Sequence, residues 1–240
     1  MIFIENNKTD AMLHFSLEEL FARYIKSNEP VFMLWQTEKT VMLGNNQFVK
    51  AEVDVAFSKE KNISIVRRSS GGGAIYTDPG TFLYSVIEPF INDPKVHRER
   101  VADNIVKALN SLGVSAVREG RNDILVNGKK ISGFAQYTAG THICTHGSLL
   151  YDADLETLAK VLIANESKLH PKGITSIRSR VTNIKPYLGD LTVKEFAVLL
   201  KKELCADVDI TGYDFSDDDL KKISLIYDEK YSNKKWTFKL

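Results

Sequence analysis

The chain has few cysteines and almost no excess of charge of either sign. Its two cysteines among 240 residues, Cys144 and Cys205, lie far apart and lack the spacing of metal ligands, which argues against a disulfide framework and a zinc site. We expect Cys205 to be a small buried apolar residue. Lysine and arginine number 32 against 31 aspartate and glutamate, a net charge of +1, so overall charge favours binding to neither nucleic acid nor a membrane.

Segments for secretion or membrane insertion are also missing from the residue pattern. Residues 1–7 lack the basic region and long apolar core of a signal peptide, and no apolar run approaches the ~20 residues of a spanning helix. Neither an internal repeat nor a low-complexity tract is visible. Hydrophobic residues make up 43% of the chain and charged residues 26%, as in ordinary globular proteins. We therefore expect a cytoplasmic protein.

Helical and strand patterns alternate irregularly along the chain. Apolar periodicity and capping side chains predict helices over 11–26 and 97–112 and helix starts at Asp154, at Thr192 with Glu195, and at Ser216 with Asp219. β-rich runs predict strands over 31–35 and 40–43, paired as a hairpin, and over 82–87. This order favours an α+β fold with a mixed, largely antiparallel sheet and flanking helices over a regular βαβ series.

The most informative stretch is the loop at residues 67–78, RRSSGGGAIYTD, which follows the β-rich run 63–66. Glycine has no Cβ to keep a ligand from the backbone, so three consecutive glycines allow backbone N–H groups to point into a concavity. Arg67 or Arg68 would then neutralise a bound phosphate or carboxylate. The alternative is a glycine-rich hairpin with surface arginines.

A second informative feature is the hairpin predicted around Asn127-Gly128, a strong short-range turn signal. A two-residue loop sets three opposing pairs: Val126 with Lys129, Leu125 with Lys130, and Asp123 with Ser132. Because side chains alternate across a strand, one face carries Ile124, Val126 and Ile131, and the other carries Asp123, Leu125, Lys130 and Ser132. Lys130, unlike Lys129, therefore shares a face with Asp123. It is either a ligand-binding lysine or an ordinary solvated one.

Three segments, in the same order, resemble the signature of lipoate–protein ligases and of the related octanoyl and lipoyl transferases. They are residues 67–78, residues 120–133 (GRNDILVNGKKISG) and residues 172–183 (KGITSIRSRVTN). The resemblance covers nearly the whole chain. It implies the fold shared by lipoate ligases, biotin ligases and class II synthetases, with residues 1–185 as the catalytic domain and residues 186–240 as a helical tail continuous with it.

The resemblance also implies a reaction. Lipoate is activated with ATP to lipoyl-AMP and pyrophosphate, and the lipoyl group then passes to a lysine of a carrier domain. The implied carriers are E2 subunits of 2-oxoacid dehydrogenases and the glycine-cleavage H protein. The implied small molecules are ATP and lipoate as substrates and Mg²⁺ as the metal, and we expect the enzyme to be a monomer.

The same resemblance assigns roles to individual residues. Lys130 is the implied catalytic residue, because its compact ammonium would bridge the lipoate carboxylate and the α-phosphate of ATP. The implied contacts to ATP and lipoyl-AMP are Arg68, Gly73, Ala74, Ile75, Tyr76, Asn122, Asp123 and Lys130. The implied contacts to lipoate are Gly72, Gly73, Lys130, Gly133 and His146. Asp123 is a candidate ligand for Mg²⁺, or forms a salt bridge to Lys130 across the hairpin.

Other interpretations stay open at this stage. Cys144 lies two residues before His146, and a thiolate there would allow lipoyl or octanoyl transfer without ATP; its alternative is a free buried thiol. A lipoate-binding module without activity is a further alternative, although it needs no lysine beside a phosphate.

The end of the chain and one basic segment add two more open points. Many ligases continue into a C-terminal accessory domain after a segment like 234–238, whereas this chain ends at Leu240. The resemblance thus implies that this domain is absent or belongs to a separate polypeptide, and an enzyme that only transfers preformed lipoyl-AMP is an alternative. Lys172, Arg178 and Arg180 either bind an anionic ligand or carrier, or pair with helix ends and carboxylates.

Overall fold

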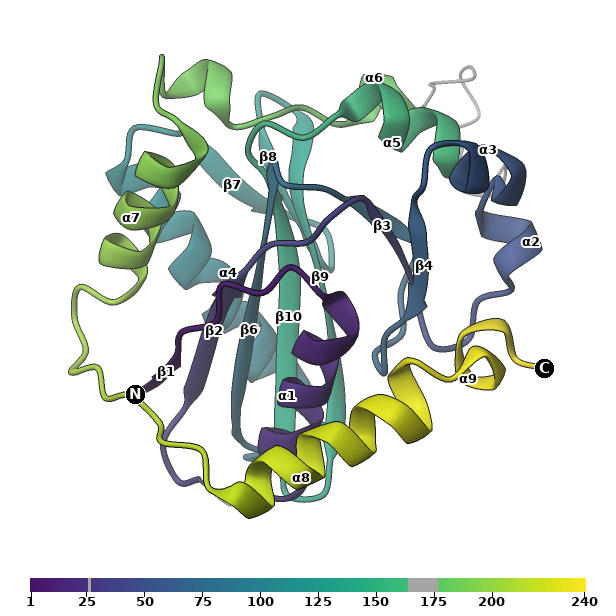
Figure 1. Ribbon diagram of the computed structural model, residues 1–240. Helices are drawn as coiled ribbons and strands as arrows, with labels where there is room; N and C mark the ends of the chain where they lie inside the picture. Colours follow the sequence, from purple (N-terminus) through teal and green to yellow (C-terminus); the bar gives the residue numbers. More distant parts are fainter. Residues whose placement is uncertain (26, 164–176) are drawn as a thin grey trace.

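The computed structural model describes residues 1–25, 27–163 and 177–240, and a large sheet forms the centre of this described part (Figure 1). Its strands lie in the order β1-β2-β6-β10-β9-β8-β7. Their bounds are Ile2–Ile4 for β1, Val31–Trp35 for β2, Thr81–Pro89 for β6, His142–Leu150 for β10, Lys129–Ala139 for β9, Asp123–Val126 for β8 and Ala116–Glu119 for β7. Of these neighbours β1 and β2 run parallel and the rest antiparallel, so the predicted α+β fold is confirmed.

A smaller sheet stands beside the large one (Figure 1). In it β3 (Thr40–Leu43) lies between β4 (Ser64–Arg67), to which it is parallel, and β5 (Ile75–Thr77), to which it is antiparallel. The predicted hairpin of residues 31–35 with 40–43 is wrong, because β2 pairs with β1 and β6 while β3 belongs to the smaller sheet. Both strands are buried almost throughout, and their partners come from elsewhere in the chain. A short polar connection of this kind can join two paired strands in a tight turn, and it can equally lead the chain from one sheet to the other.

Helices cover both faces of the large sheet and the outside of the smaller one (Figure 1). Those on the large sheet are α1 (Ala11–Arg23), α4 (Pro94–Ser111), α7 (Val193–Leu204) and α8 (Asp217–Ile226). Those near the smaller sheet are α2 (Val49–Glu52), α3 (Val55–Glu60), α5 (Leu155–Val161), α6 (Ile177–Arg180) and α9 (Lys234–Phe238). Two further turns of helix are η2 (Lys185–Tyr187) and η3 (Tyr227–Tyr231).

Each face of the large sheet buries its own core, because side chains alternate along every strand. Phe32 and Tyr84 belong to the core beneath α4 and α7. Their sequence neighbours Val31 and Leu83 belong to the opposite core, which α1 and α8 cover. Helices α7 and α8 both lie in residues 186–240, so the C-terminal part of the chain contributes to the cores on both faces.

The helix starts predicted from capping side chains are confirmed. Asp154 accepts a hydrogen bond from the Thr157 N–H at the start of α5. Both capping boxes are complete, Thr192 with Glu195 at α7 and Ser216 with Asp219 at α8. Helix α4 begins before the predicted residue 97, because Asp93 caps it and Pro94 suits the first helical position. Helix α1 ends at Arg23, and the predicted end at residue 26 lies outside the described residues.

Among the described residues, no helix has both the length and the apolar character needed to cross a membrane.

Candidate active site

A cavity of about 870 Å³ is lined by strands of both sheets and by the glycine loop, residues 68–74. All residues that the resemblance implied for the site line this cavity: Arg68, Gly72, Gly73, Ala74, Ile75, Tyr76, Asn122, Asp123, Lys130, Gly133 and His146. The fold thus brings together the glycine loop, the β8–β9 hairpin and β10, which are far apart in sequence. Their roles toward ligands remain predictions.

One part of the cavity wall is apolar, and the sequence analysis did not predict its residues as part of a site. Its residues, Phe15, Trp35, Met42 and Leu83, come from α1, β2, β3 and β6. The Phe15 and Trp35 rings meet edge to face, with centroids 5.9 Å apart. In sequence these residues follow the ordinary periodicity of core positions, so their spacing carries no sign of a binding site.

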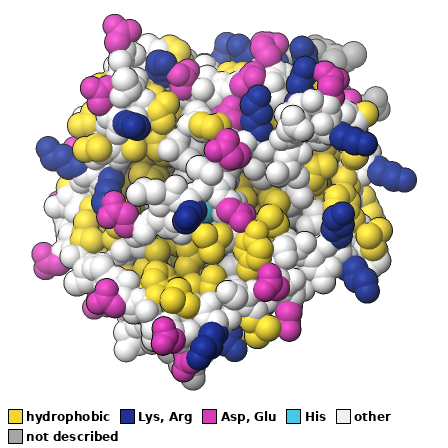
Figure 2. Space-filling view, in the orientation of Figure 1, with side chains coloured by type: hydrophobic (Ala, Val, Ile, Leu, Met, Phe, Trp, Pro, Cys, Tyr) yellow, Lys and Arg dark blue, Asp and Glu magenta, His cyan; other side chains and the backbone are white. Residues whose placement is uncertain are grey.

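The polar part of the wall contains Asn122, Asp123, Lys130, Glu119 and Arg180. Figure 2 shows one face of the molecule, on which hydrophobic side chains gather in groups with single Lys, Arg, Asp and Glu side chains between them. A cavity with a charged part and an apolar part suits an elongated ligand that has one anionic end and one apolar end.

Lys130 and Asp123 form an ion pair across the hairpin, with Lys130 Nζ 2.7 Å from Asp123 Oδ1. The predicted pairs Val126 with Lys129 and Leu125 with Lys130 are confirmed. The predicted pair Asp123 with Ser132 is wrong, because Asp123 lies opposite Gly133 and Ile124 opposite Ser132. The shift is a β-bulge, in which Ile131 is an extra residue on β9.

The bulge places Gly133 beneath the Lys130 side chain. A Cβ at position 133 would lie 2.8 Å from Lys130 Nζ, so glycine leaves the space through which this lysine passes. Asn122 holds the same stretch in place, since its Nδ2 donates to Phe134 O at 3.1 Å and the Phe134 N–H donates to Asn122 O at 3.1 Å. The hairpin therefore presents Lys130, Asp123 and Asn122 on one wall of the cavity.

Arg68 supports the glycine loop through its backbone carbonyls. Its Nη2 donates to Gly71 O and Gly73 O, each at 2.8 Å, and its Nη1 to Met42 O at 3.0 Å. Burial lowers the pKa of Arg68 to about 10, and the nearby Glu18 carboxylate opposes that shift, so the side chain is a cation at neutral pH. Arg68 therefore shapes the loop and also places a positive charge in the cavity wall.

Arg67 points elsewhere. It is fully buried, and its guanidinium donates to the carbonyls of Gly44, Asn45, Trp236 and Thr237 at 2.7 to 3.1 Å. It is not among the described residues that line the cavity. The interpretation of the loop as a hairpin with surface arginines is therefore wrong, and of the two arginines Arg68 is the one that reaches the cavity.

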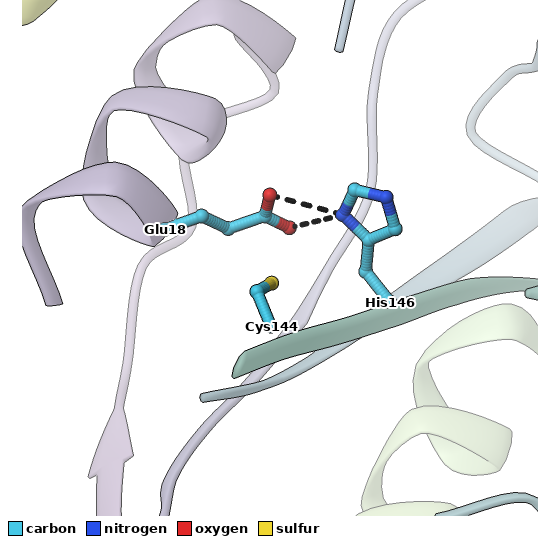
Figure 3. A group of neighbouring side chains, drawn as sticks. All are labelled: Glu18, Cys144 and His146. Atoms are coloured by element: carbon cyan, nitrogen blue, oxygen red, sulfur yellow. Dashed lines mark hydrogen bonds and ion pairs between the residues drawn. The ribbon is translucent and has the colours of Figure 1, made fainter. Parts of the chain in front are cut away.

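His146 is fixed in the cavity wall by hydrogen bonds at both ring nitrogens. Figure 3 shows the Glu18 carboxylate pointing at the imidazole, with Nδ1 2.9 and 3.0 Å from the two carboxylate oxygens. On the other side Nε2 lies 2.6 Å from Ser70 Oγ in the glycine loop. With Glu18 ionised, Nδ1 carries the proton and Nε2 accepts from Ser70. Both ring nitrogens of His146 are therefore already bonded to side chains of the protein, while the residue lines the cavity.

Residues 10–205 match a family model described as the lipoyl protein ligase A/B catalytic domain. The chain belongs to this family. It is 34% identical over 240 residues to lipoate–protein ligase 1 of Staphylococcus aureus, covering 99% of this chain and 73% of that protein. It is 33% identical over 243 residues to lipoate–protein ligase LplJ of Bacillus subtilis, again covering 99% of this chain and 73% of the relative.

Solved structures of lipoate ligases share the fold. The putative lipoate protein ligase Ta0514 from T. acidophilum with bound lipoic acid has a TM-score of 0.87 at 22% identity, over 100% of this chain and 98% of that one. A lipoate–protein ligase A bound with ATP has a TM-score of 0.85 at 22% identity, over 99% and 98% of the two chains. The family resemblance found in the sequence is thus confirmed.

Within this family member, Cys144 is a buried free thiol beside the Glu18–His146 pair (Figure 3). Burial, and then the Glu18 carboxylate, raise the pKa of Cys144 well above its ordinary value, which keeps the thiol protonated. It is not among the described residues that line the cavity. Both observations argue against a thiolate nucleophile.

Glu18, Cys144 and His146 are also the residue types of a zinc site, with ligand atoms within 4.8 Å of one another. Hydrogen bonds between the Glu18 carboxylate and the His146 imidazole account for this arrangement without a metal. A metal bound at His146 Nδ1 would have to replace the proton that forms these bonds.

Part of the basic segment after residue 176 lines the cavity beside the hairpin. Ser179, Arg180 and Val181 line it, and Val181 pairs with Lys130 as the Thr182 N–H donates to Lys130 O at 3.0 Å. Arg178 instead pairs with Glu156 at 2.8 Å, one of the alternatives left open for it. Lys172 lies outside the described residues.

Proposed function

We propose that this chain is a lipoate–protein ligase, which makes lipoyl-AMP from lipoate and ATP and transfers the lipoyl group to a lysine of a carrier domain. The observation that supports this most directly is the single cavity in which the family motifs meet, with Lys130 on one wall and the glycine loop on another. The names of relatives that are 33 and 34% identical over nearly the whole chain support the same activity.

The two parts of the cavity match the two substrates. The lipoate carboxylate and the α-phosphate of ATP would meet at Lys130, in the part of the cavity that Asn122 and Arg180 also line. Backbone groups of residues 73–76 would contact the adenylate. The dithiolane end of lipoate would lie against the apolar part of the wall, where aromatic edges favour contact with sulfur.

Lys130 would catalyse adenylation by charge. Its ammonium exchanges the Asp123 carboxylate for one carboxylate oxygen of lipoate and one oxygen of the α-phosphate, whose mutual repulsion otherwise opposes attack. The carboxylate oxygen then forms a bond to the α-phosphorus, and the bond to pyrophosphate breaks. Lys130 stabilises the charge that develops at the α-phosphate.

Asp123 and Glu119 lie opposite each other on β8 and β7, and both line the cavity. Carboxylate oxygens of this kind fit Mg²⁺, which would neutralise phosphate charge when bound. The donor set thus favours a magnesium site at the polar part of the cavity.

Transfer of the lipoyl group needs a carrier lysine at the same place. Its uncharged amine attacks the carbonyl of the mixed anhydride and releases AMP. We infer that the carriers are lipoyl domains of E2 subunits or the glycine-cleavage H protein. A solved structure with the same fold comes from a structural analysis of a bi-partite lipoate protein ligase and its E2 lipoyl domain from Thermoplasma acidophilum. We further infer a monomer in the cytoplasm, with residues 1–185 as the catalytic domain and 186–240 as a tail continuous with it.

The decisive experiment measures both half-reactions on one preparation. Pyrophosphate release from lipoate, ATP and Mg²⁺ is expected, followed by a lipoyl mass increase on an added lipoyl domain. Transfer from synthetic lipoyl-AMP without adenylation would instead support the transferase that needs preformed lipoyl-AMP. ATP-independent transfer from an acylated carrier would overturn the proposal.

A further inference from the structure

The C-terminal segment, residues 227–238, contacts the glycine loop at Ser69, a residue to which the family resemblance assigned no role. Ser69 Oγ lies 2.9 Å from Lys230 Nζ and 2.8 Å from Tyr231 Oη, residues that follow it by more than 160 positions. Behind them, Glu19 Oε2 accepts from Lys230 Nζ at 2.5 Å and from Tyr231 Oη at 2.8 Å. Glu19 and Tyr231 are both buried. Ser69 is therefore tied to α1 through η3.

The next serine of the loop is tied to α1 through a different route. Ser70 Oγ bonds to His146, and His146 bonds to Glu18, the residue before Glu19. Two consecutive carboxylates of α1 thus hold two consecutive serines of the loop, one through β10 and the other through the C-terminal segment.

A second contact from the C-terminal segment lies two residues before Ser69, at Arg67, where β4 ends. Trp236 Nε1 donates to Arg67 O at 2.9 Å, and the Arg67 guanidinium returns bonds to Trp236 O and Thr237 O. The contacts at Arg67 and Ser69 flank Arg68, which holds the carbonyls of Gly71 and Gly73.

We propose that Lys230, Tyr231 and Trp236 are positioning residues, which hold Arg67 and Ser69 so that Arg68 and residues 71–73 keep the shape that receives the acid. Three consecutive glycines lose much conformational entropy when they adopt one shape, so the loop needs external ties. None of the three positioning residues is among the described residues that line the cavity, so they act through the loop.

The effect on binding follows from the fraction of molecules whose loop is in the competent shape. When that fraction falls, the apparent dissociation constant for the acid rises by the same factor, while the bound complex still reacts normally. Loss of one of these hydrogen bonds should therefore raise Kd and KM for lipoate roughly three- to tenfold and change kcat little. This inference deepens the proposed ligase function and rests on it for the identity of the acid.

The test compares Tyr231→Phe and Ser69→Ala with Tyr227→Phe. Tyr227 lies in the same turn, but its hydroxyl donates to Asp10 Oδ2 at 2.8 Å rather than to Ser69 or Glu19, so it is a matched control. Hydrogen–deuterium exchange of the peptide containing residues 69–75, with no ligand added, is expected to be faster in Tyr231→Phe and Ser69→Ala and unchanged in Tyr227→Phe. Isothermal titration with lipoate is expected to show the rise in Kd only in the first two. The double variant should bind no more weakly than Ser69→Ala, which already loses the contacts to both Lys230 and Tyr231.

The two readouts separate this inference from the proposed function. Failure of the unmodified protein to bind lipoate would count against the ligase proposal, yet exchange of the loop would still test the positioning role. Unchanged loop exchange in Tyr231→Phe and Ser69→Ala, or equal acceleration in Tyr227→Phe, would overturn the positioning role.

Discussion

Lys130 Nζ lies 2.7 Å from Asp123 Oδ1, across a hairpin whose strands shift register by one residue next to this pair. The ion pair keeps the ammonium on the cavity side of the sheet, while Ile124, Val126 and Ile131 face the core. One side of the hairpin thus supports folding, and the other presents charge to the cavity.

Lys130→Ala should lower lipoyl-AMP formation by at least about 100-fold, because the variant lacks the positive charge between carboxylate and phosphate. Its thermal stability should change little, since partly exposed ion pairs contribute at most about 1 kcal/mol. Pyrophosphate release and a circular dichroism melt measure the two effects. Lys129→Ala is the control, with a mild effect expected because that side chain is exposed on the other face. Adenylation near the normal rate in Lys130→Ala would contradict the mechanism.

Cys144→Ser should retain most of the activity, and ATP should remain necessary for lipoylation. The thiol is buried and protonated, and serine conserves its volume and its ability to donate to Glu18. Intact mass spectrometry after incubation with an acylated carrier should show no adduct on the enzyme. A lipoyl or octanoyl adduct at Cys144 would restore the thiolate mechanism.

Gly44→Ala should disturb the glycine loop, because a Cβ at position 44 would overlap the Gly72 carbonyl, a backbone group that cannot rotate away. We expect a loss of about 1–3 kcal/mol in the free energy of unfolding, together with a higher KM for lipoate. Gly71→Ala is the matched control, since a Cβ there meets open space and its φ is not positive. Chemical denaturation and steady-state kinetics provide the measurements. Equal effects of the two substitutions would show that close packing against Gly72 is unimportant.

His14 should make the fold sensitive to acid. Burial lowers the pKa of His14 below the ordinary 6.5, although the Lys8 carbonyl and the Glu18 and Asp10 carboxylates act in the opposite direction. As pH falls through 6.5, the unfolded chain binds a proton at residue 14 before the folded protein does. The unfolded state then holds more protons, so the free energy of unfolding decreases as pH falls and is regained as pH rises.

Urea denaturation of the unmodified protein and of His14→Gln between about pH 5 and 7 tests this sensitivity. The pH dependence should be shallower in the variant, whatever its stability at neutral pH. Parallel curves would show that another group causes the effect.

Short-range features of the site could be predicted from the sequence. The Asn127-Gly128 turn depends on residues that tolerate positive φ, and both have it in the structure. The turn and strand alternation were sufficient to put Lys130 on the face of Asp123. The capping boxes at Thr192 and Ser216 are likewise local, because the groups that bond lie three residues apart.

Long-range features could not be predicted in this way. Residues 31–35 and 40–43 look alike as strands, and only their distant partners place them in different sheets. The bulge at Ile131 could not be predicted from side-chain alternation either. Alternation places Ile131 in the core, where it packs, but gives no sign that the pairing with β8 shifts at this residue. In the glycine loop, the residue pattern leaves the roles of Arg67 and Arg68 open, and only the family resemblance singled out Arg68.

The sequence by itself determined the family motifs, the turn that places Lys130 and the capped starts of α5, α7 and α8, because each depends on residues within a few positions of one another. Tertiary structure decided which carbonyls hold Arg67 away from the cavity, which apolar residues form the cavity wall and how the C-terminal segment holds Ser69. These outcomes depend on contacts between segments as far apart as Ser69 and Tyr231. The physical reason is that a buried donor must find an acceptor in whatever segment packs against it, and the fold of the whole chain selects that segment.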